Sequence, residues 1–169
     1  VLVLYGDVPL ITAETLRALL AARRSGAALA VLAFEPEDSA AYGRLVVGPD
    51  GMLERIVERL DTDAATAEIA LCNSGIMAVD GAILFSLLDE LGNDNAKGEY
   101  YLTDIVASAR ARALDCVHAM AAPEEVMGIN DRVQLAEAEA VQQTRLRQAA
   151  MINGATLLDP ATTWFSVDT

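Results

Sequence analysis

The sequence is poor in residues on which several classes of protein depend. It has only two cysteines, Cys72 and Cys116, and one histidine, His118. Two cysteines make no disulfide framework, and their spacing matches no zinc pattern, so we expect both in the core. His118 lies in an apolar stretch and is interpreted as structural. The sequence also contains no Ser-His-Asp set, no His/Cys metal cluster and no Walker motif.

Positive charge is equally scarce. Twelve Lys and Arg residues stand against 25 Asp and Glu residues, and the formal net charge is -13. Nucleic acid and anionic membranes both require a basic face, so neither is expected as a partner. A nucleotide substrate is compatible with this charge, because small phosphates are held by backbone N–H groups, a few basic side chains and a metal.

Long apolar runs and targeting segments are missing too. No run reaches the roughly 18 residues that a membrane span needs, and no signal peptide is present. Together with the few cysteines, this predicts a cytoplasmic protein. The length of 169 residues predicts one domain, and a hydrophobic content of 53% is enough for a sizeable core. Because the chain begins without Met inside an apolar run, we expect it to be a fragment.

The first 35 residues predict a strand–helix–strand unit. Val1–Leu4 and Ala28–Phe34 are apolar runs typical of buried parallel strands. Between them, Thr12 is a plausible N-cap of a helix that Gly26 would end. Two strands joined by one helix predict a parallel pair with a right-handed crossover.

The rest of the chain continues the alternation of strands and helices. Arg44–Val47 and Met52–Val57 flank a Gly-Pro-Asp-Gly turn and predict a hairpin. Further elements are expected in order: a strand within Ile69–Val79, helices over 80–91 and 103–113, a strand near 116–119, and a helix over 131–149. This order predicts an α/β domain with a mostly parallel central sheet and an inserted hairpin.

Polar residues at strand ends are the candidates for chemistry. Asp7 follows the first apolar run, where a carboxylate with a hard cation could handle phosphate, or could simply open a turn. Asn73 interrupts an apolar strand and needs hydrogen-bond partners, since an unsatisfied amide costs roughly 1–3 kcal/mol. A sugar hydroxyl or, more simply, nearby backbone could satisfy it. Glu58 ends another strand and could bond sugar hydroxyls or be merely solvated.

One loop combines a glycine, two aromatic residues and a helix start. Gly98 provides flexibility, and Tyr100, Tyr101 and Thr103 follow it. Such a loop could wrap a sugar. Alternatively, the tyrosines seal the core while Thr103 or Asp104 caps the helix.

Several segments together resemble a known family. In the family's order and over nearly the whole chain, they match the bifunctional bacterial enzyme N-acetylglucosamine-1-phosphate uridyltransferase/glucosamine-1-phosphate acetyltransferase. The matching segments are Val1–Ile11, Ala41–Arg44, Ile56–Glu58, Asn73–Ile76, Asn93–Ile105 and Gly128–Arg132. The resemblance implies a Rossmann-like (GT-A-like) nucleotidyltransferase domain, truncated at its N-terminus.

The resemblance also implies a reaction. The family joins UTP to N-acetylglucosamine-1-phosphate, giving UDP-N-acetylglucosamine for cell-wall (peptidoglycan) synthesis and pyrophosphate. The sugar phosphate attacks in line without a covalent enzyme intermediate, so catalysis rests on positioning and charge neutralisation. Asp7 and Asn130 are similar to the family's catalytic residues and Mg²⁺ ligands. Tyr5 and Gly6 are expected beside the nucleotide.

The acceptor sugar is expected to be held by a second group of residues. By resemblance, Gly43, Glu58 and Asn73 hold N-acetylglucosamine, and Tyr101 and Thr103 close on the sugar phosphate. These complete the predicted substrate contacts, together with Tyr5, Gly6, Asp7 and Asn130.

The chain also departs from the family pattern. Residues 1–150 are expected to form the nucleotidyltransferase domain without its glycine-rich phosphate-binding loop. Residues 151–169 would begin the connection to an absent left-handed β-helix acetyltransferase domain, through which the parent forms a homo-oligomer, a trimer by resemblance. The fragment alone is therefore expected to be inactive. Leu60 stands where the family often has a basic residue, and the adjacent Arg59 is a possible substitute.

Two other functions are compatible with parts of the pattern. One is another sugar-1-phosphate nucleotidyltransferase, such as a glucose-1-phosphate uridylyl- or thymidylyltransferase, which shares the metal-binding aspartate. The other is a non-catalytic relative kept for interaction. The combination of Asp7, Glu58, Asn73 and Asn130 favours an enzyme over the latter.

Overall fold

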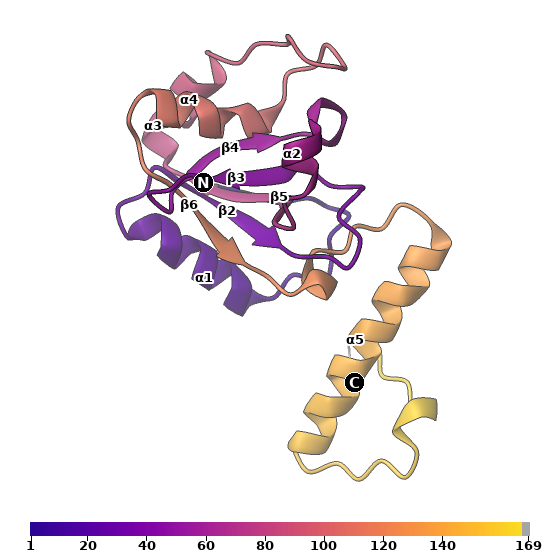
Figure 1. Cartoon of the computed structure of the whole chain (residues 1–169). Coiled ribbons are helices and arrows are strands. Elements are labelled where there is room, and N and C mark those ends of the chain that lie inside the picture. The colour runs from indigo at the N-terminus through magenta and orange to yellow at the C-terminus, as the bar shows by residue number, and fades with distance from the viewer. Residues whose placement is uncertain (167–169) are drawn as a thin grey trace.

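The computed structural model describes residues 1–166, in which an α/β body carries one long C-terminal helix (Figure 1). The strands are β1 (Leu2–Val3), β2 (Leu29–Phe34), β3 (Arg44–Val47), β4 (Leu53–Val57), β5 (Cys72–Val79) and β6 (Cys116–Met120). The helices are α1 (Ala13–Arg24), α2 (Ala64–Ala67), α3 (Gly81–Leu88), α4 (Ile105–Ala111) and α5 (Arg132–Ile152). Short 3₁₀ turns lie at Arg59–Asp61, Leu102–Asp104, Pro123–Val126 and Pro160–Thr162.

The six strands form one sheet in the order β4-β3-β5-β2-β6, with β1 pairing β5 as well. The α/β class and the hairpin β3–β4 are confirmed. The mostly parallel character needs correction, because β2 and β6 are the one parallel pair within residues 1–166, and the other pairs are antiparallel. The reason is β5, which lies between β1 and β2 and runs against both. The strands of the first unit therefore share a direction without being neighbours.

The first strand is also shorter and more exposed than predicted. Only Leu2 and Val3 form ladder pairs, and both pair with β5. Val1 is 60% exposed and Leu4 is 47% exposed. Within the described chain β1 has one neighbouring strand, so it lies at an edge and the prediction of a buried interior strand is wrong.

The core has two halves, one on each face of the sheet. Strand β2 is buried throughout and sends alternate side chains to opposite faces. Leu29, Val31 and Ala33 pack with α3 and α4, whereas Ala30, Leu32 and Phe34 pack with α1 (Figure 1). Because β2 is covered on both faces, its sequence is continuously apolar, as in a buried central strand.

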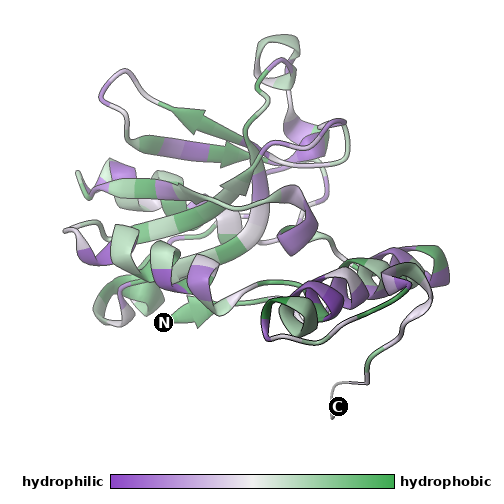
Figure 2. Cartoon of the chain, turned by 90° about the horizontal axis from the view of Figure 1, so that it is seen from below, coloured by the Kyte–Doolittle hydropathy of each residue, from purple (hydrophilic) through white to green (hydrophobic). Residues whose placement is uncertain are grey.

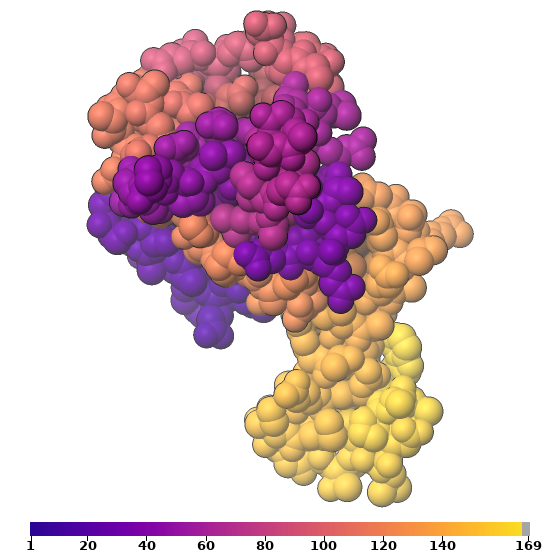
Figure 3. Space-filling model, in the orientation of Figure 1, coloured from indigo at the N-terminus to yellow at the C-terminus, as the bar shows by residue number. Residues whose placement is uncertain are grey.

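Helix α5 extends away from this body (Figure 3). Asp131 caps it, and its buried residues are Ala138 and Gln143. The Gln143 side chain donates to the Phe165 carbonyl (2.8 Å) and accepts from the Phe165 N–H (2.9 Å), so the chain after α5 returns along the helix. The surface of α5 mixes polar and apolar residues, in contrast to the apolar strands of the sheet (Figure 2). The boundary expected at residue 150 thus falls inside α5, and the last three residues of the predicted connection lie outside the described chain.

The length and apolarity that a membrane crossing requires are not combined in any helix within residues 1–166.

Candidate functional site

The first candidate region, called here the Asp7 hollow, is a cavity of about 220 Å³ beyond the end of β1. Its lining residues come from segments far apart in the sequence: Tyr5, Asp7, Val8, Phe34, Tyr42, Asn73, Ser74, Val126 and Gly128. The Phe34 and Tyr42 rings meet edge to face with centroids 4.8 Å apart. The fold therefore brings the predicted Tyr5, Asp7 and Asn73 to one place.

Asp7 lies directly against the loop that precedes α5. The Ile129 N–H donates to the Asp7 carbonyl at 2.9 Å. A Cβ added at Gly128 would lie 3.8 Å from Asp7 Oδ2, an ordinary contact distance, so Gly128 lies directly beside the carboxylate. A contact across about 120 residues of sequence thus joins two of the predicted motifs.

Asn130 stands at the end of the same loop. Its N–H donates to the Gln134 side chain at 2.6 Å, and the next residue, Asp131, caps α5 through the N–H groups of Val133 and Gln134. Asp7 and Asn130 are both exposed. One carboxylate and one amide on adjoining loops supply the hard oxygen donors that Mg²⁺ takes in small number while keeping its waters. The donor types therefore fit the predicted metal.

Tyr5 is placed by a glycine that the sequence analysis did not single out. Gly75 has φ +81°, and a Cβ there would lie 2.0 Å from Tyr5 Cε2. The Ser74 hydroxyl donates to the Leu32 carbonyl at 2.6 Å, where the β2–β5 register shifts. The Asn-Ser-Gly interruption of the strand was visible in the sequence, but the ring seated on Gly75 could not be read from it.

Asn73 has one of the two partners considered for it, the backbone. Its Oδ1 accepts from the Gly75 N–H at 2.9 Å, which is the backbone satisfaction expected for a polar residue at a strand irregularity. Its Nδ2 has no hydrogen-bond partner within the described chain. Because the side chain is half-buried and lines the Asp7 hollow, a donor is left available there.

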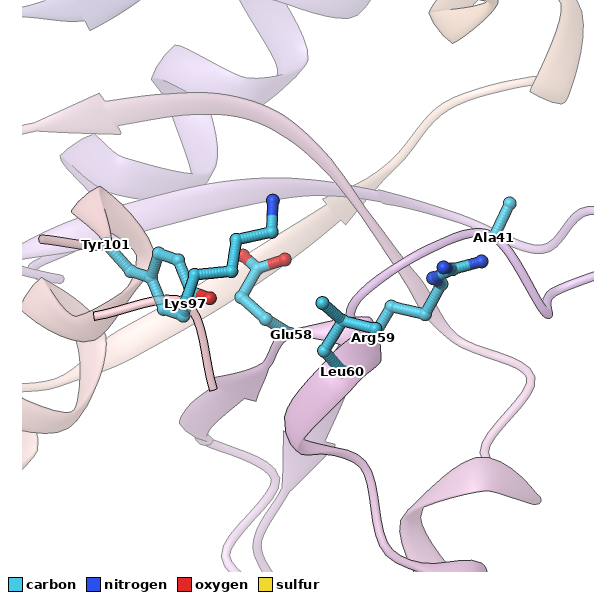
Figure 4. Close-up of a pocket in the computed structure, with 6 residues that line it drawn as sticks. All are labelled: Ala41, Glu58, Arg59, Leu60, Lys97 and Tyr101. Carbon is cyan, nitrogen blue, oxygen red and sulfur yellow. The ribbon is translucent and has the colours of Figure 1, made fainter. Parts of the chain in front are cut away.

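The second candidate region, called here the Glu58 hollow, is a cavity of about 210 Å³ at the end of β4 (Figure 4). It is lined by Ala41, Glu58, Arg59, Leu60, Lys97 and Tyr101. The buried Thr103 hydroxyl donates to Glu58 Oε1 at 2.9 Å. The Glu58 carboxylate is thereby oriented by one of the residues predicted to act with it.

Gly43 joins the two regions. A Cβ at this position would lie 3.3 Å from Glu58 Oε2, so a side chain would crowd the carboxylate. On its other side, the Gly43 carbonyl accepts from the Asn73 N–H at 2.9 Å. The predicted residues therefore form two neighbouring hollows and not one crevice: Asp7 and Asn73 line one, and Glu58 lines the other.

Carboxylates dominate the electrostatics around the Glu58 hollow. Burial raises the pKa of Tyr101, and Asp61, Glu99 and Glu58 raise it further. Burial likewise raises the pKa of Asp104, with added repulsion from Glu58 and Asp61. Groups that donate hydrogen bonds or carry positive charge are thus favoured in this hollow.

The two cysteines are free and buried, as expected from the sequence. Burial raises the pKa of Cys116 to about 11 and raises that of Cys72 above its ordinary value. Both thiols are therefore protonated at neutral pH, the form in which cysteine is a weak nucleophile.

Solved structures define the class of fold. The chain is similar to a nucleoside-diphosphate-sugar pyrophosphorylase from Vibrio cholerae, with TM-score 0.52 and 11% identity over 68% of this chain and 47% of the other. It is also similar to a CMP:2-keto-3-deoxy-manno-octonic acid synthetase in complex with CTP, with TM-score 0.55 and 16% identity over 85% and 61%. The body is thus a Rossmann-like nucleotidyltransferase fold.

Curated proteins of higher sequence identity match the chain over its whole length. The chain is 57% identical to the bifunctional protein GlmU of Paramagnetospirillum magneticum over 100% of its own length and 38% of the relative. The GlmU proteins of Rhodospirillum rubrum and Maricaulis maris are 56% and 52% identical, over 38% and 37% of their lengths. No protein-family model matches the chain. Over its whole length the chain is similar to one part of these bifunctional GlmU proteins, and it spans about 38% of their length.

Proposed function

We propose that the protein transfers a uridylyl group from UTP to N-acetylglucosamine-1-phosphate, giving UDP-N-acetylglucosamine for cell-wall synthesis and pyrophosphate. The observation that carries this proposal is the junction of Asp7 with the Gly128–Asn130 loop beside the Asp7 hollow. Asp7 and Gly128 both line this cavity, and Asn73, whose Nδ2 group is without a partner in the described chain, lines it too. The 57% identity to a GlmU protein supports the same assignment.

In this proposal the Asp7 hollow serves the nucleotide and the reacting phosphates. An oxygen of the sugar phosphate forms a bond to the α-phosphorus of UTP, while the bond from that phosphorus to the pyrophosphate oxygen breaks. Asp7 and Asn130 would hold Mg²⁺, which neutralises phosphate charge when bound. Tyr5, fixed on Gly75, and Gly6 provide a surface beside the nucleotide. No residue acts as a nucleophile, so the work of the chain is orientation.

The acceptor sugar would lie across Gly43, between the two hollows. The Asn73 Nδ2 group donates to one sugar oxygen, and the Glu58 carboxylate accepts from a hydroxyl. Thr103 holds Glu58 in orientation through its 2.9 Å hydrogen bond. Tyr101 closes the outer side of the hollow. A site built to bond polar groups in this way rejects sugars that lack them, because its own groups would be left unpaired.

A substrate panel tests the proposal. The full-length gene product that includes these residues is assayed for pyrophosphate release with UTP, dTTP or CTP and with N-acetylglucosamine-1-phosphate or glucose-1-phosphate. We expect the highest kcat/KM with UTP and N-acetylglucosamine-1-phosphate, and none without divalent metal. A preference for dTTP or glucose-1-phosphate would assign the protein to the other sugar nucleotidyltransferases. If no pair of substrates is turned over, the protein is a non-catalytic relative.

We also propose that the full-length gene product is a homo-oligomer assembled outside residues 1–150. Sedimentation of the same sample measures its oligomeric state.

A further inference from the structure

Helix α5 is hydrogen-bonded to both of the loops that carry the predicted metal ligands. Near the start of the helix, the Gln134 side chain accepts from the Asn130 N–H at 2.6 Å. Further along, the Arg145 guanidinium donates to the Leu10 carbonyl at 2.7 Å, and Leu10 lies in the same loop as Asp7. One helix therefore holds both loops.

The Gln134 contact differs from an ordinary helix cap. Asp131 is the N-cap of α5, and its Oδ1 accepts from the N–H groups of Val133 (2.8 Å) and Gln134 (2.9 Å). In a capping box, the side chain three residues after the N-cap accepts from the N–H of the N-cap residue itself. Here Gln134 bonds the N–H one residue earlier, that of Asn130. The bond thus fixes the predicted ligand residue and not only the end of the helix.

The Arg145 contact fixes the other loop in a shielded place. The Arg145 side chain is half-buried, and Leu10 is 4% exposed. A hydrogen bond from a charged donor is stronger than one between neutral groups. The two loops are also tied to each other, because the Ile129 N–H donates to the Asp7 carbonyl at 2.9 Å. The backbones of Asp7 and Asn130 are therefore braced from α5 as well as from each other.

Such bracing matters for a cation held by few protein groups. Mg²⁺ requires near-ideal octahedral geometry and keeps several of its waters, so each protein oxygen has to stand at a defined place. Asp7 and Asn130 are exposed, and no packing of their own side chains fixes them. Groups that orient metal ligands from outside contribute to metal affinity without touching the ion.

We propose that Gln134 and Arg145 are positioning residues, which hold the Asn130 and Asp7 loops at the separation that a divalent cation requires. Helix α5 thereby sets the metal affinity of the site. The inference rests on the proposed function and adds two residues outside the set assigned by resemblance. Loss of either contact raises the metal concentration needed for half-maximal turnover, whereas kcat at saturating metal is recovered, because the ligands themselves remain.

Binding of Mn²⁺ to the full-length gene product, followed by the electron paramagnetic resonance of the free ion, tests this without turnover. The binding that Asp7→Ala retains defines sites elsewhere and is subtracted. Because an outer hydrogen-bond partner of a metal ligand contributes strongly to affinity, Gln134→Leu should weaken Mn²⁺ by about ten-fold. Arg145→Gln should give a smaller loss, since the Asp7 loop keeps its bond to Ile129.

The same helix offers matched controls. Gln142 is a half-buried glutamine of α5 without a side-chain hydrogen bond in the described chain. Arg147 also donates to a backbone carbonyl, but to that of Thr163 at 3.2 Å. Gln142→Leu and Arg147→Gln should bind Mn²⁺ as the wild type does. Gln134→Glu keeps an acceptor for the Asn130 N–H and should retain at least the wild-type affinity.

Initial rates across a magnesium titration provide the second measurement. The half-maximal Mg²⁺ concentration should rise in Gln134→Leu and Arg145→Gln, with kcat restored at saturating Mg²⁺. A merely structural role would lower the melting temperature without this shift. Melting curves report whether each variant is folded, and Gln134→Ser repeats the test should the leucine variant not fold.

The outcomes separate this inference from the proposed function. Mn²⁺ affinities of Gln134→Leu and Arg145→Gln equal to those of their controls would overturn the positioning role and leave the proposed function standing. A loss of kcat that saturating Mg²⁺ does not restore would also overturn it. A preference of the wild type for another sugar phosphate or nucleotide would refute the proposed function alone. If Asp7→Ala binds Mn²⁺ as the wild type does, the predicted metal site and the positioning role are both refuted.

Discussion

The two hollows are built by different means. The Asp7 hollow depends on glycines and backbone contacts: Gly128 lies beside the carboxylate, Gly75 receives the Tyr5 ring, and the Asp7 carbonyl accepts a hydrogen bond from the Ile129 N–H. The Glu58 hollow is lined by charged side chains from two segments, with the Lys97 ammonium above the Glu58 carboxylate (Figure 4). A backbone-built site holds atoms in fixed positions, whereas a side-chain-built site discriminates between ligands. We therefore expect loss of the Asp7 carboxylate to lower turnover, and changes to the groups that seat the nucleotide or the sugar to lower affinity.

Removal of the Asp7 carboxylate should give the largest effect. We expect Asp7→Ala to lower kcat by about a hundred-fold or more, since it removes an oxygen ligand where phosphate charge is neutralised. Stability should stay within about 0.5 kcal/mol of wild type, because the exposed side chain makes no hydrogen bond with the described chain. Initial rates across a magnesium titration and urea unfolding measure the two quantities. Near-normal kcat at saturating magnesium would show that the two hollows do not divide the work as proposed.

A side chain at Gly75 should damage the Asp7 hollow without touching a charged group. Gly75→Ala combines a strained positive φ with a Cβ 2.0 Å from the Tyr5 ring. We expect a loss of about 1–2 kcal/mol from the backbone strain, together with displacement of Tyr5 and a raised KM for UTP. Urea unfolding and UTP kinetics provide the measurement.

Two variants control for that result. Gly92→Ala adds a methyl group at a position with nothing within 4 Å and should change stability by less than about 0.5 kcal/mol. Combining Gly75→Ala with Tyr5→Ala removes the clash and leaves the strain. If the Gly75 variant is as stable as the Gly92 variant, the ring has no fixed seat on β5.

How far the sequence predicts the fold differs between its elements. Ala28–Phe34 was predicted as a buried strand from continuous apolarity, and β2 is buried on both faces. Thr12 was predicted to cap α1, and its side chain accepts from the Thr15 N–H. Strand direction was not predictable in the same way, because the insertion of β5 between β1 and β2 depends on long-range pairing that leaves no local pattern.

The same distinction between local sequence patterns and long-range contacts applies to the candidate site. Asp7, Glu58 and Asn73 stood out because each is polar beside an apolar strand, a local signal. Their separation into two hollows follows from the position of Gly43, which only the fold determines.

Asn73 lies beside the junction of the hollows and allows its two roles to be separated. Asn73→Ala removes both the acceptor for the Gly75 N–H and the free Nδ2 donor, whereas Asn73→Asp keeps the acceptor. We expect both variants to weaken N-acetylglucosamine-1-phosphate by about ten-fold, since both lose the donor, with UTP affected less. Binding curves for N-acetylglucosamine-1-phosphate and UTP measure the two affinities in each variant. If Asn73→Asp binds the sugar phosphate normally, Asn73 serves only the strand irregularity.

The smallest effect should come from a carboxylate next to the Glu58 hollow. Burial raises the pKa of Asp104, with Glu58 and Asp61 adding to it, so the folded state favours its protonated form. The stability it contributes is complete below the ordinary value of 3.8 and is lost as pH rises through the higher folded pKa. Asp104→Asn imitates the protonated form and breaks no capping bond. At pH 7 it should stabilise the fold, by less than about 1 kcal/mol because the site is partly solvated. The gain in stability should vanish as the pH approaches 3.8.

Asp50→Asn should destabilise the fold at pH 7. The Met52 N–H and Arg110 lower the pKa of Asp50, so the stability that its carboxylate contributes is lost on acidification. Urea unfolding at a series of pH values measures both, and destabilisation by Asp104→Asn at pH 7 would contradict the negative potential assigned to the Glu58 hollow.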